Sequence, residues 1–169
     1  MKRKAPDPKP ATPDPPQPLP ASIQAPASSI QAIEERFAPI VEAVAAVARG
    51  GDPPAVRLEG AMEIIFGAYG QSDHDFSEML LAGWMRARHD KHHRLALAWQ
   101  REQLRLSLEE ILRAGVAAGA FRKQLDTDAV AAVMLSAAEG CLLQSATQGG
   151  AVPPGELVKA LMSLALSGV

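Results

Sequence analysis

Cysteine is almost absent from this sequence of 169 residues, in which Cys141 stands alone. A single cysteine excludes an internal disulfide and a cysteine-ligated zinc site, and it is typical of proteins of the reducing cytoplasm. Aromatic residues are also scarce, at 4%, and Val, Ile and Thr together number 20, against 31 Ala and 18 Leu. This balance excludes an all-β protein and predicts an all-α fold. The length suits one domain.

A large net charge and long apolar runs are also missing. The formal net charge is −2, so the chain as a whole is not built to bind a polyanion. No uninterrupted apolar run approaches the ~20 residues that cross a bilayer, and the N-terminus has no apolar signal core. The sequence therefore predicts a cytoplasmic protein without a membrane partner.

Catalytic motifs are lacking as well. The sequence contains no Gly-rich phosphate loop and no nucleophile elbow, and none of its eleven glutamates has a histidine three residues later, as a di-iron bundle requires. Cys141 falls within a predicted helix, where a buried thiol is inert. We expect neither an enzyme nor a cofactor.

One cluster of histidines can be compared with a metal site. His89, His92 and His93 lie near Asp90 at the predicted start of a helix, where two of the imidazoles share a face. The flanking cations Arg88, Lys91 and Arg94 oppose a metal ion electrostatically. A polar helix N-terminus is therefore favoured over metal binding, and we expect no metal.

Proline divides the chain into two parts. Nine of the fourteen prolines fall within residues 1–26, and proline-rich sequence neither nucleates helices nor packs a core. Residues 1–27 are thus predicted to be a disordered tail, and residues 28–169 one all-α domain. In that domain the apolar period and the capping residues predict six helices: 29–49, 53–70, a third from about 73, 90–118, 126–147, and a last one after Pro153–Pro154. Asp52 and Asp126 are the predicted N-caps of the second and fifth helices, and Pro39 should kink the first helix or mark a later start. The apolar side of the fourth helix is predicted to include Leu95, Trp99 and Leu104.

Large side chains gather on the second, third and fourth predicted helices. Such groups either enclose an adaptable apolar cavity or simply pack a solid core, and the pattern leaves both readings open. The predicted pocket residues are Met62, Phe66, Tyr69, Met79, Trp84 and Trp99.

The last two predicted helices carry very little charge, with Glu139 alone between Ala129 and Ser145. An apolar surface left over after packing within the chain would be covered most simply by a second copy, so a homodimer is predicted. On the fourth predicted helix, Arg94, Arg101 and Arg105 are interleaved with glutamates, so a solvated face of ion pairs is expected there rather than a nucleic-acid stripe. Arg101 is accordingly expected to be exposed and insensitive to charge reversal. The predicted interface residues are Met134, Ala138, Cys141, Leu142, Leu157, Leu161 and Leu164.

Two segments resemble the C-terminal regulatory half of TetR/AcrR-type transcriptional regulators. They are the stretch LRAGVAAGAFRKQLD that begins at Leu112 and the run AEGCLLQ over 138–144. In that family a long helix ends in a glycine-rich turn, and an acidic cap opens the next helix. The resemblance spans roughly residues 30–169 and implies a dimerising domain that senses an apolar or amphipathic small molecule.

The resemblance implies a three-helix DNA-binding domain before residue 30, where this sequence has the proline-rich tail, and we expect no recognition helix within residues 1–27. We therefore expect no direct DNA binding by this chain alone. The alternative function is a structural or protein-interaction bundle without an effector pocket. The volume of any enclosed cavity discriminates between the two.

Overall fold

The computed structural model describes residues 29–70, 74–148 and 153–166, and all of its regular structure is helical. The prediction of an all-α fold with six helices is confirmed. The predicted tail, residues 1–27, lies outside the described residues. Within these residues no helix is long and apolar enough to cross a membrane. The helices are α1 (Ile30–Ala48), α2 (Pro54–Gly70), α3 (His74–Ala87), α4 (Lys91–Ala117), α5 (Thr127–Gln148) and α6 (Pro154–Leu166).

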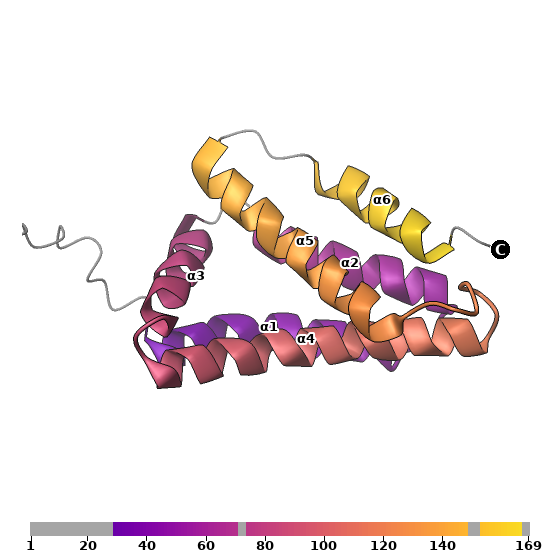
Figure 1. Ribbon diagram of the computed structural model, residues 1–169, viewed down its shortest axis with the longest axis horizontal. Helices are drawn as coiled ribbons and strands as arrows, with labels where there is room; N and C mark the ends of the chain where they lie inside the picture. The colour runs from indigo at the N-terminus through magenta and orange to yellow at the C-terminus, as the bar shows by residue number, and fades with distance from the viewer. Residues whose placement is uncertain (1–28, 71–73, 149–152, 167–169) are drawn as a thin grey trace, which may run out of the picture.

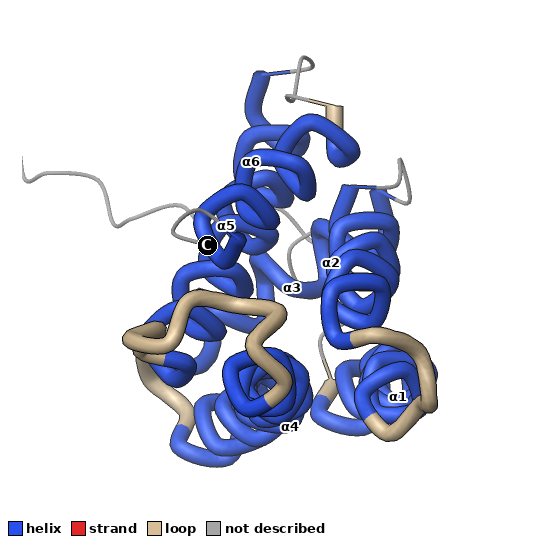
Figure 2. Tube along the Cα trace, turned by 90° about the vertical axis from the view of Figure 1, so that its right-hand side faces the viewer, coloured by secondary structure: helices blue, strands red, loops and turns tan. Residues whose placement is uncertain are grey.

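The helices form layers around one core. α1 and α4 lie side by side, α2 and α5 cover them, and α6 packs on the outer side of α2 (Figure 1). The short helix α3 crosses one end of the bundle against α4. The view in Figure 2 runs almost along the axes of α1 and α4 and shows α2 stacked above α1. α4 makes its main contacts with α1, α2, α3 and α5.

Apolar side chains from every helix fill the space between these layers. Burial of such side chains is the main stabilising contribution to a fold of this kind. The largest fully buried side chains are Ile33, Leu58, Met62, Ile65, Phe66, Tyr69, Leu80, Leu104, Leu108, Ile111, Leu112 and Met134.

Three helices begin at side chains that accept a hydrogen bond from the first turn. Ser29 Oγ accepts from the amide of Ala32 at 3.1 Å, and Asp126 Oδ1 accepts from the amide of Ala129 at 3.1 Å. Asp90 Oδ1 accepts from the amide of His92 at 2.8 Å. Because the first amides of a helix have no partner within it, such caps fix where the helix starts. The predicted cap at Asp126 is confirmed.

One histidine of the predicted cluster, His93, supports the cap at Asp90 with its side chain. His93 is buried, and its Nδ1 lies 2.8 Å from Asp90 Oδ2. This hydrogen bond, helped by the amide of His92, lowers the pKa of the Asp90 carboxyl from its ordinary value. Among the residues with a described structure, no group of three or more His, Cys, Asp or Glu side chains is placed to hold a metal ion.

The start of α2 differs from its prediction by one residue. Asp52 was the expected cap and Pro53 the first helical residue, but α2 begins at Pro54, and the carbonyl oxygen of Pro53 accepts from the amide of Arg57 at 3.0 Å. A residue that precedes a proline is disfavoured in the helical region, so the second proline of the pair sets the start. Inside α1, Pro39 neither ends the helix nor delays its start.

The turn after α4 is defined by two glycines. Gly119 has a φ of 73°, and the amide of Ala120 donates to the carbonyl oxygen of Gly115 at 2.8 Å while that of Gly119 donates to Val116 at 3.1 Å. This is a Schellman motif, which requires a left-handed residue after the helix. The buried Phe121 ring then packs directly onto Gly115, where an added Cβ would clash with the ring.

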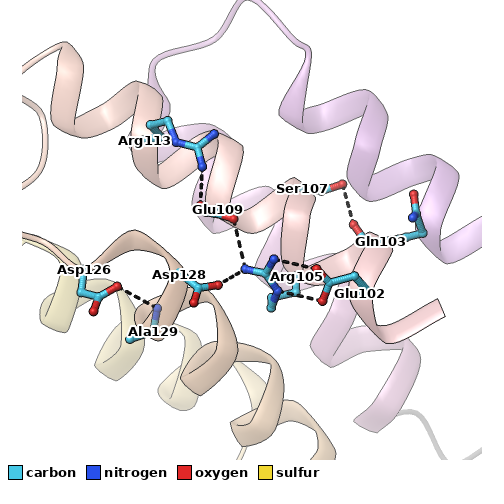
Figure 3. A network of polar contacts seen from close by, with 9 residues as sticks. All are labelled: Glu102, Gln103, Arg105, Ser107, Glu109, Arg113, Asp126, Asp128 and Ala129. Atoms are coloured by element: carbon cyan, nitrogen blue, oxygen red, sulfur yellow. Dashed lines mark hydrogen bonds and ion pairs between the residues drawn. The ribbon is translucent and has the colours of Figure 1, made fainter. Parts of the chain in front are cut away.

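Ion pairs join α4 to α5 beyond this turn. The Arg105 guanidinium contacts Glu102 and Glu109 on its own helix and Asp128 on α5, and Glu109 also pairs with Arg113 (Figure 3). The hydrogen bond with Glu102 is the main reason why the pKa of Arg105 lies above its ordinary value. The expected solvated face of paired charges on α4 is present, and it also fixes the first turn of α5.

Replacing Gly115 by alanine should destabilise the protein by about 1–3 kcal/mol, because the new methyl group forces the Phe121 ring out of its site. Gly67→Ala is the matched control: it lies in α2 with open space around its Cβ position, and should stabilise by about 0.5–1 kcal/mol. Urea denaturation measures both changes. Equal effects of the two substitutions would contradict the close packing of Phe121.

Candidate functional site

A cavity of about 220 Å³ opens where α1, α2, α3, α4 and α5 converge. Each of these five helices contributes at least one side chain to its wall, and most of the lining is apolar. The cavity thus lies at the point where the layers of the bundle meet. It is lined by Phe37, Tyr69, Trp84, Ala87, Arg94, Leu97, Ala98, Arg101 and Glu139.

Aromatic rings make one side of this cavity rigid. The ring centroids of Phe37 and Tyr69 are 6.4 Å apart at an interplanar angle of 70°, and both rings also pack against Phe76, at 5.7 and 5.9 Å. Tilted and edge-on pairs at these distances attract one another beyond their apolar burial. The half-buried Trp84 adds a fourth ring to the region, and like Phe37 and Tyr69 it lines the cavity.

Three charged side chains of the lining, those of Arg94, Arg101 and Glu139, are at least partly exposed, and we call this part of the cavity its mouth. Arg101 donates from Nε to Glu139 Oε1 at 2.7 Å and from Nη2 to Ser136 Oγ at 3.0 Å, which links α4 to α5. The side chain of Arg101 is 42% exposed and that of Glu139 is 19% exposed. Nearer the start of α4, Arg94 donates from Nη1 to the carbonyl oxygen of Ala87 at 3.3 Å.

Burial and these charges both change the pKa of the Tyr69 hydroxyl. Desolvation by burial raises the pKa of Tyr69 above its ordinary value, the nearby Glu139 carboxylate raises it further, and the Arg101 guanidinium lowers it. Tyr69 is therefore held neutral, as a hydroxyl group inside a largely apolar wall.

The predicted pocket residues separate into three groups. Tyr69 and Trp84 line the cavity. Met62, Phe66 and Met79 are buried in the core around it and do not contribute to its wall. Trp99 lies on the opposite side of α4 and is 63% exposed.

The prediction for Trp99 placed it on the wrong face of α4. The buried stripe of this helix runs through Leu97, Leu104, Leu108 and Ile111. Trp99 precedes Leu104 by five residues, which is a rotation of about 500°, or 140° away from the stripe. Leu95 is exposed for the same reason.

Sequence reasoning missed the polar part of the site. Arg94 and Arg101 were assigned to a solvated face, whereas both reach the mouth of the cavity, and Arg101 is not the isolated surface position that the sequence predicts. Glu139 carried a usable signal, because it is the lone charge in the middle of an otherwise apolar helix. The sequence contains no signal that would single out Phe37, because its position does not differ from those of the other core residues of α1.

Comparison with known proteins gives the chain its family. A family model described as the C-terminal domain of BetI-type transcriptional repressors matches residues 54–167. The chain belongs to this family. A crystal structure of a TetR family transcriptional regulator, PfmR from Thermus thermophilus, has the same fold, with a TM-score of 0.58 over 83% of this chain and 73% of that chain at 22% sequence identity. No curated protein matches the chain.

Membership of this family confirms two predictions from the sequence. The resemblance to the regulatory half of TetR-type regulators is correct, and the chain is not an enzyme, because the family consists of transcriptional regulators. The matched residues begin at α2 and include the cavity side chains from α2 to α5.

Within the BetI-type domain, most of the predicted interface residues are covered by the chain itself. Met134, Ala138, Cys141 and Leu142 lie on the face of α5 that packs into the bundle, and Leu161 is likewise buried on α6. Leu157 is half-buried, and the side chain of Leu164 lies outside the described residues. Because α5 is apolar all round, its sequence does not reveal which face turns inward.

The opposite face of α5 carries the apolar surface that remains. Val133 is 54% exposed and Leu143 is 42% exposed, and between them the Cβ position of Gly140 meets open space. Spacings of seven and three residues place these positions on one side of the helix. We call Val133, Gly140 and Leu143 the outer stripe of α5.

Tyr69 is the sole tyrosine of the sequence, so its ionisation is directly observable. Because its pKa is raised in the folded state, the unfolded chain loses the phenolic proton at about pH 10 while the native domain keeps it. The free energy of unfolding should therefore be unaffected by Tyr69 below pH 10 and fall above it. Tyrosinate absorbance during alkaline titration should appear together with loss of helical circular dichroism, and Tyr69→Phe should weaken the alkaline loss. Tyrosinate formed near pH 10 in a still-native protein would contradict this.

Proposed function

We propose that this BetI-type domain binds a small-molecule effector in the cavity between α1 and α5 and transmits its presence to a transcriptional regulator. The observation that carries the proposal is the cavity of about 220 Å³, lined by three aromatic rings and by the charged side chains of Arg94, Arg101 and Glu139. Apolar concavities with a few placed polar groups are the usual form of small-molecule sites.

The location of the cavity explains how binding is transmitted. A ligand inside it contacts side chains from five helices at once, so it favours whichever arrangement of those helices fits it best. The Arg101–Glu139 ion pair and the Arg105–Asp128 ion pair connect α4 to α5 along the same path. Binding would therefore act on the position of α5 relative to α4.

The structural-bundle alternative is favoured by one observation. Met62, Phe66 and Met79, three of the large side chains that were predicted to line a pocket, are buried in the core and do not line the cavity. In that alternative the cavity is a minor packing defect at the bundle surface. A direct binding measurement separates the two functions.

Tryptophan fluorescence can detect a ligand in the cavity, because one of the two tryptophans, Trp84, lines the cavity and the other, Trp99, is exposed on the opposite side of α4. In the Trp99→Phe variant, Trp84 alone reports on the cavity wall. Benzyl alcohol or benzoate should change its emission with saturable dependence, and both compounds and indole should raise the melting temperature with the logarithm of ligand concentration.

The Trp84→Phe variant provides the control. There the exposed Trp99 is the remaining indole, and its emission should not respond to the same compounds. If no compound of the panel changes Trp84 emission or the melting temperature, the effector-binding proposal fails and the structural bundle is the better description.

We also propose that the domain dimerises through α5 and α6. The outer stripe of α5 supports this, because apolar and small side chains on an exposed helix face allow close packing with a second helix. An isologous contact of α5 and α6 with the same helices of a second copy would cover that stripe.

Val133→Glu should dissociate the dimer while leaving the protomer folded, because Val133 is exposed and a glutamate there meets solvent in the monomer. Val56→Glu, at an equally exposed valine on α2, is the matched control and should leave the assembly intact. Sedimentation velocity and circular dichroism measure both properties. Ala138→Arg should unfold the chain instead, because Ala138 is buried within it. A monomeric unmodified protein at tens of micromolar would overturn the dimer.

Direct DNA reading is not assigned to the described bundle. Arg101, Arg105 and Arg113 on α4 are each paired with a carboxylate, so they do not form a basic stripe for phosphates. We propose that the domain acts on DNA through whatever reader it is coupled to.

A further inference from the structure

The charges around the cavity are unequal. Arg94 and Arg101 contribute two positive charges to the lining, and Glu139 contributes one negative charge, which leaves a net charge of +1. Glu139 is engaged by Arg101 at 2.7 Å. Among the described residues, no carboxylate lies within ion-pair distance of Arg94, whose polar contact is the carbonyl oxygen of Ala87. One cation at the mouth therefore lacks an acidic partner in this part of the chain.

The spacing along α4 places this cation over the cavity. Arg94 and Arg101 are seven residues apart, which is two helical turns and about 10 Å, so both project from the same side of the helix. Ala98 lies between them and also lines the cavity. Its side chain is a single methyl group, which takes up little of the space along this side of the helix.

The remaining wall restricts the ligand to a compact apolar body. Phe37, Trp84 and Leu97 offer rings and branched carbon to it. A cavity of about 150 Å³ accommodates benzene in an engineered protein, so the 220 Å³ available here suit one aromatic ring with a small substituent. A guanidinium group binds a carboxylate by two parallel hydrogen bonds.

We propose, building on the effector-binding function above, that the cavity selects a small aromatic monocarboxylate, with its ring between Phe37 and Trp84 and its carboxylate paired with Arg94. Arg101 stays paired with Glu139 and adds longer-range attraction. A cationic ligand is the competing possibility, because aromatic rings and a carboxylate also favour ammonium groups. Two guanidinium groups repel such a ligand, and the one carboxylate is already engaged.

The test uses three ligands of the same shape and different charge: benzoate, benzamide and benzamidine. Dissociation constants are measured from Trp84 emission in the full-length Trp99→Phe protein. Benzoate should bind about tenfold more tightly than neutral benzamide, because hydrogen bonds to charged groups contribute that much. Benzamidine should bind most weakly. The preference for benzoate should shrink in high salt, because Arg94 is exposed to solvent.

Substitutions test which side chain binds the carboxylate of benzoate. Arg94→Gln should weaken benzoate binding about tenfold and leave benzamide binding within about twofold. Glu139→Gln should strengthen benzoate binding, because it removes the one negative charge of the lining. Arg122→Gln is the matched control: it removes an exposed arginine of the α4–α5 loop and should change nothing. Melting temperatures of the variants verify that each is folded.

The outcomes separate this inference from the function on which it rests. Equal binding of benzoate and benzamide, tightest binding of benzamidine, or an unchanged benzoate affinity in Arg94→Gln would each overturn the carboxylate assignment while leaving an effector site in place. Failure of all three ligands, together with failure of benzyl alcohol and indole, would overturn both.

Discussion

The packing of the Phe121 ring onto Gly115 determines where α5 returns along α4. The Schellman turn at Gly119 reverses the chain, and the ring fixes the distance and direction of that reversal. From this point Asp128 meets Arg105 in the first turn of α5, and three turns further on Glu139 meets Arg101. The cavity mouth is therefore built by a contact at the far end of the same pair of helices. A shift in that contact would misalign every later pair.

Much of the fold was predictable because helix ends are local. Asp90 and Asp126 accept hydrogen bonds from their own first turns, and Gly119 adopts a left-handed conformation that few other residues tolerate. These interactions involve neighbours in sequence, so the sequence alone reveals them. The start of α2 was predicted one residue too early, because Pro53 and Pro54 are both suited to the first position of a helix. Pro54 disfavours the helical conformation at Pro53, so the helix begins at Pro54.

The site was less predictable, because it depends on how each helix is rotated about its axis. Trp99 and Leu95 looked like members of an apolar stripe until the register of Leu97 and Leu104 fixed the buried face. On α5, where apolar residues surround the axis, no periodicity distinguishes Met134 from Val133, although one is buried and the other is exposed. Arg101 and Glu139 are 38 residues apart in sequence, and only the tertiary structure brings them within 2.7 Å.

Ser136 and Glu139 lie on α5 beside the outer stripe, so the same helix contributes Glu139 to the cavity lining and the outer stripe to the exposed surface. A helix with its side chains is about 10 Å across. An event in the cavity and an event on the outer surface are then separated by a single rigid element, and no chain of intermediate residues is required between them. If the cavity binds an effector as proposed, a displacement of α5 would move both the cavity lining and the outer stripe, and its size would depend on how strongly the ion pairs of Arg101 and Arg105 hold α5 against α4.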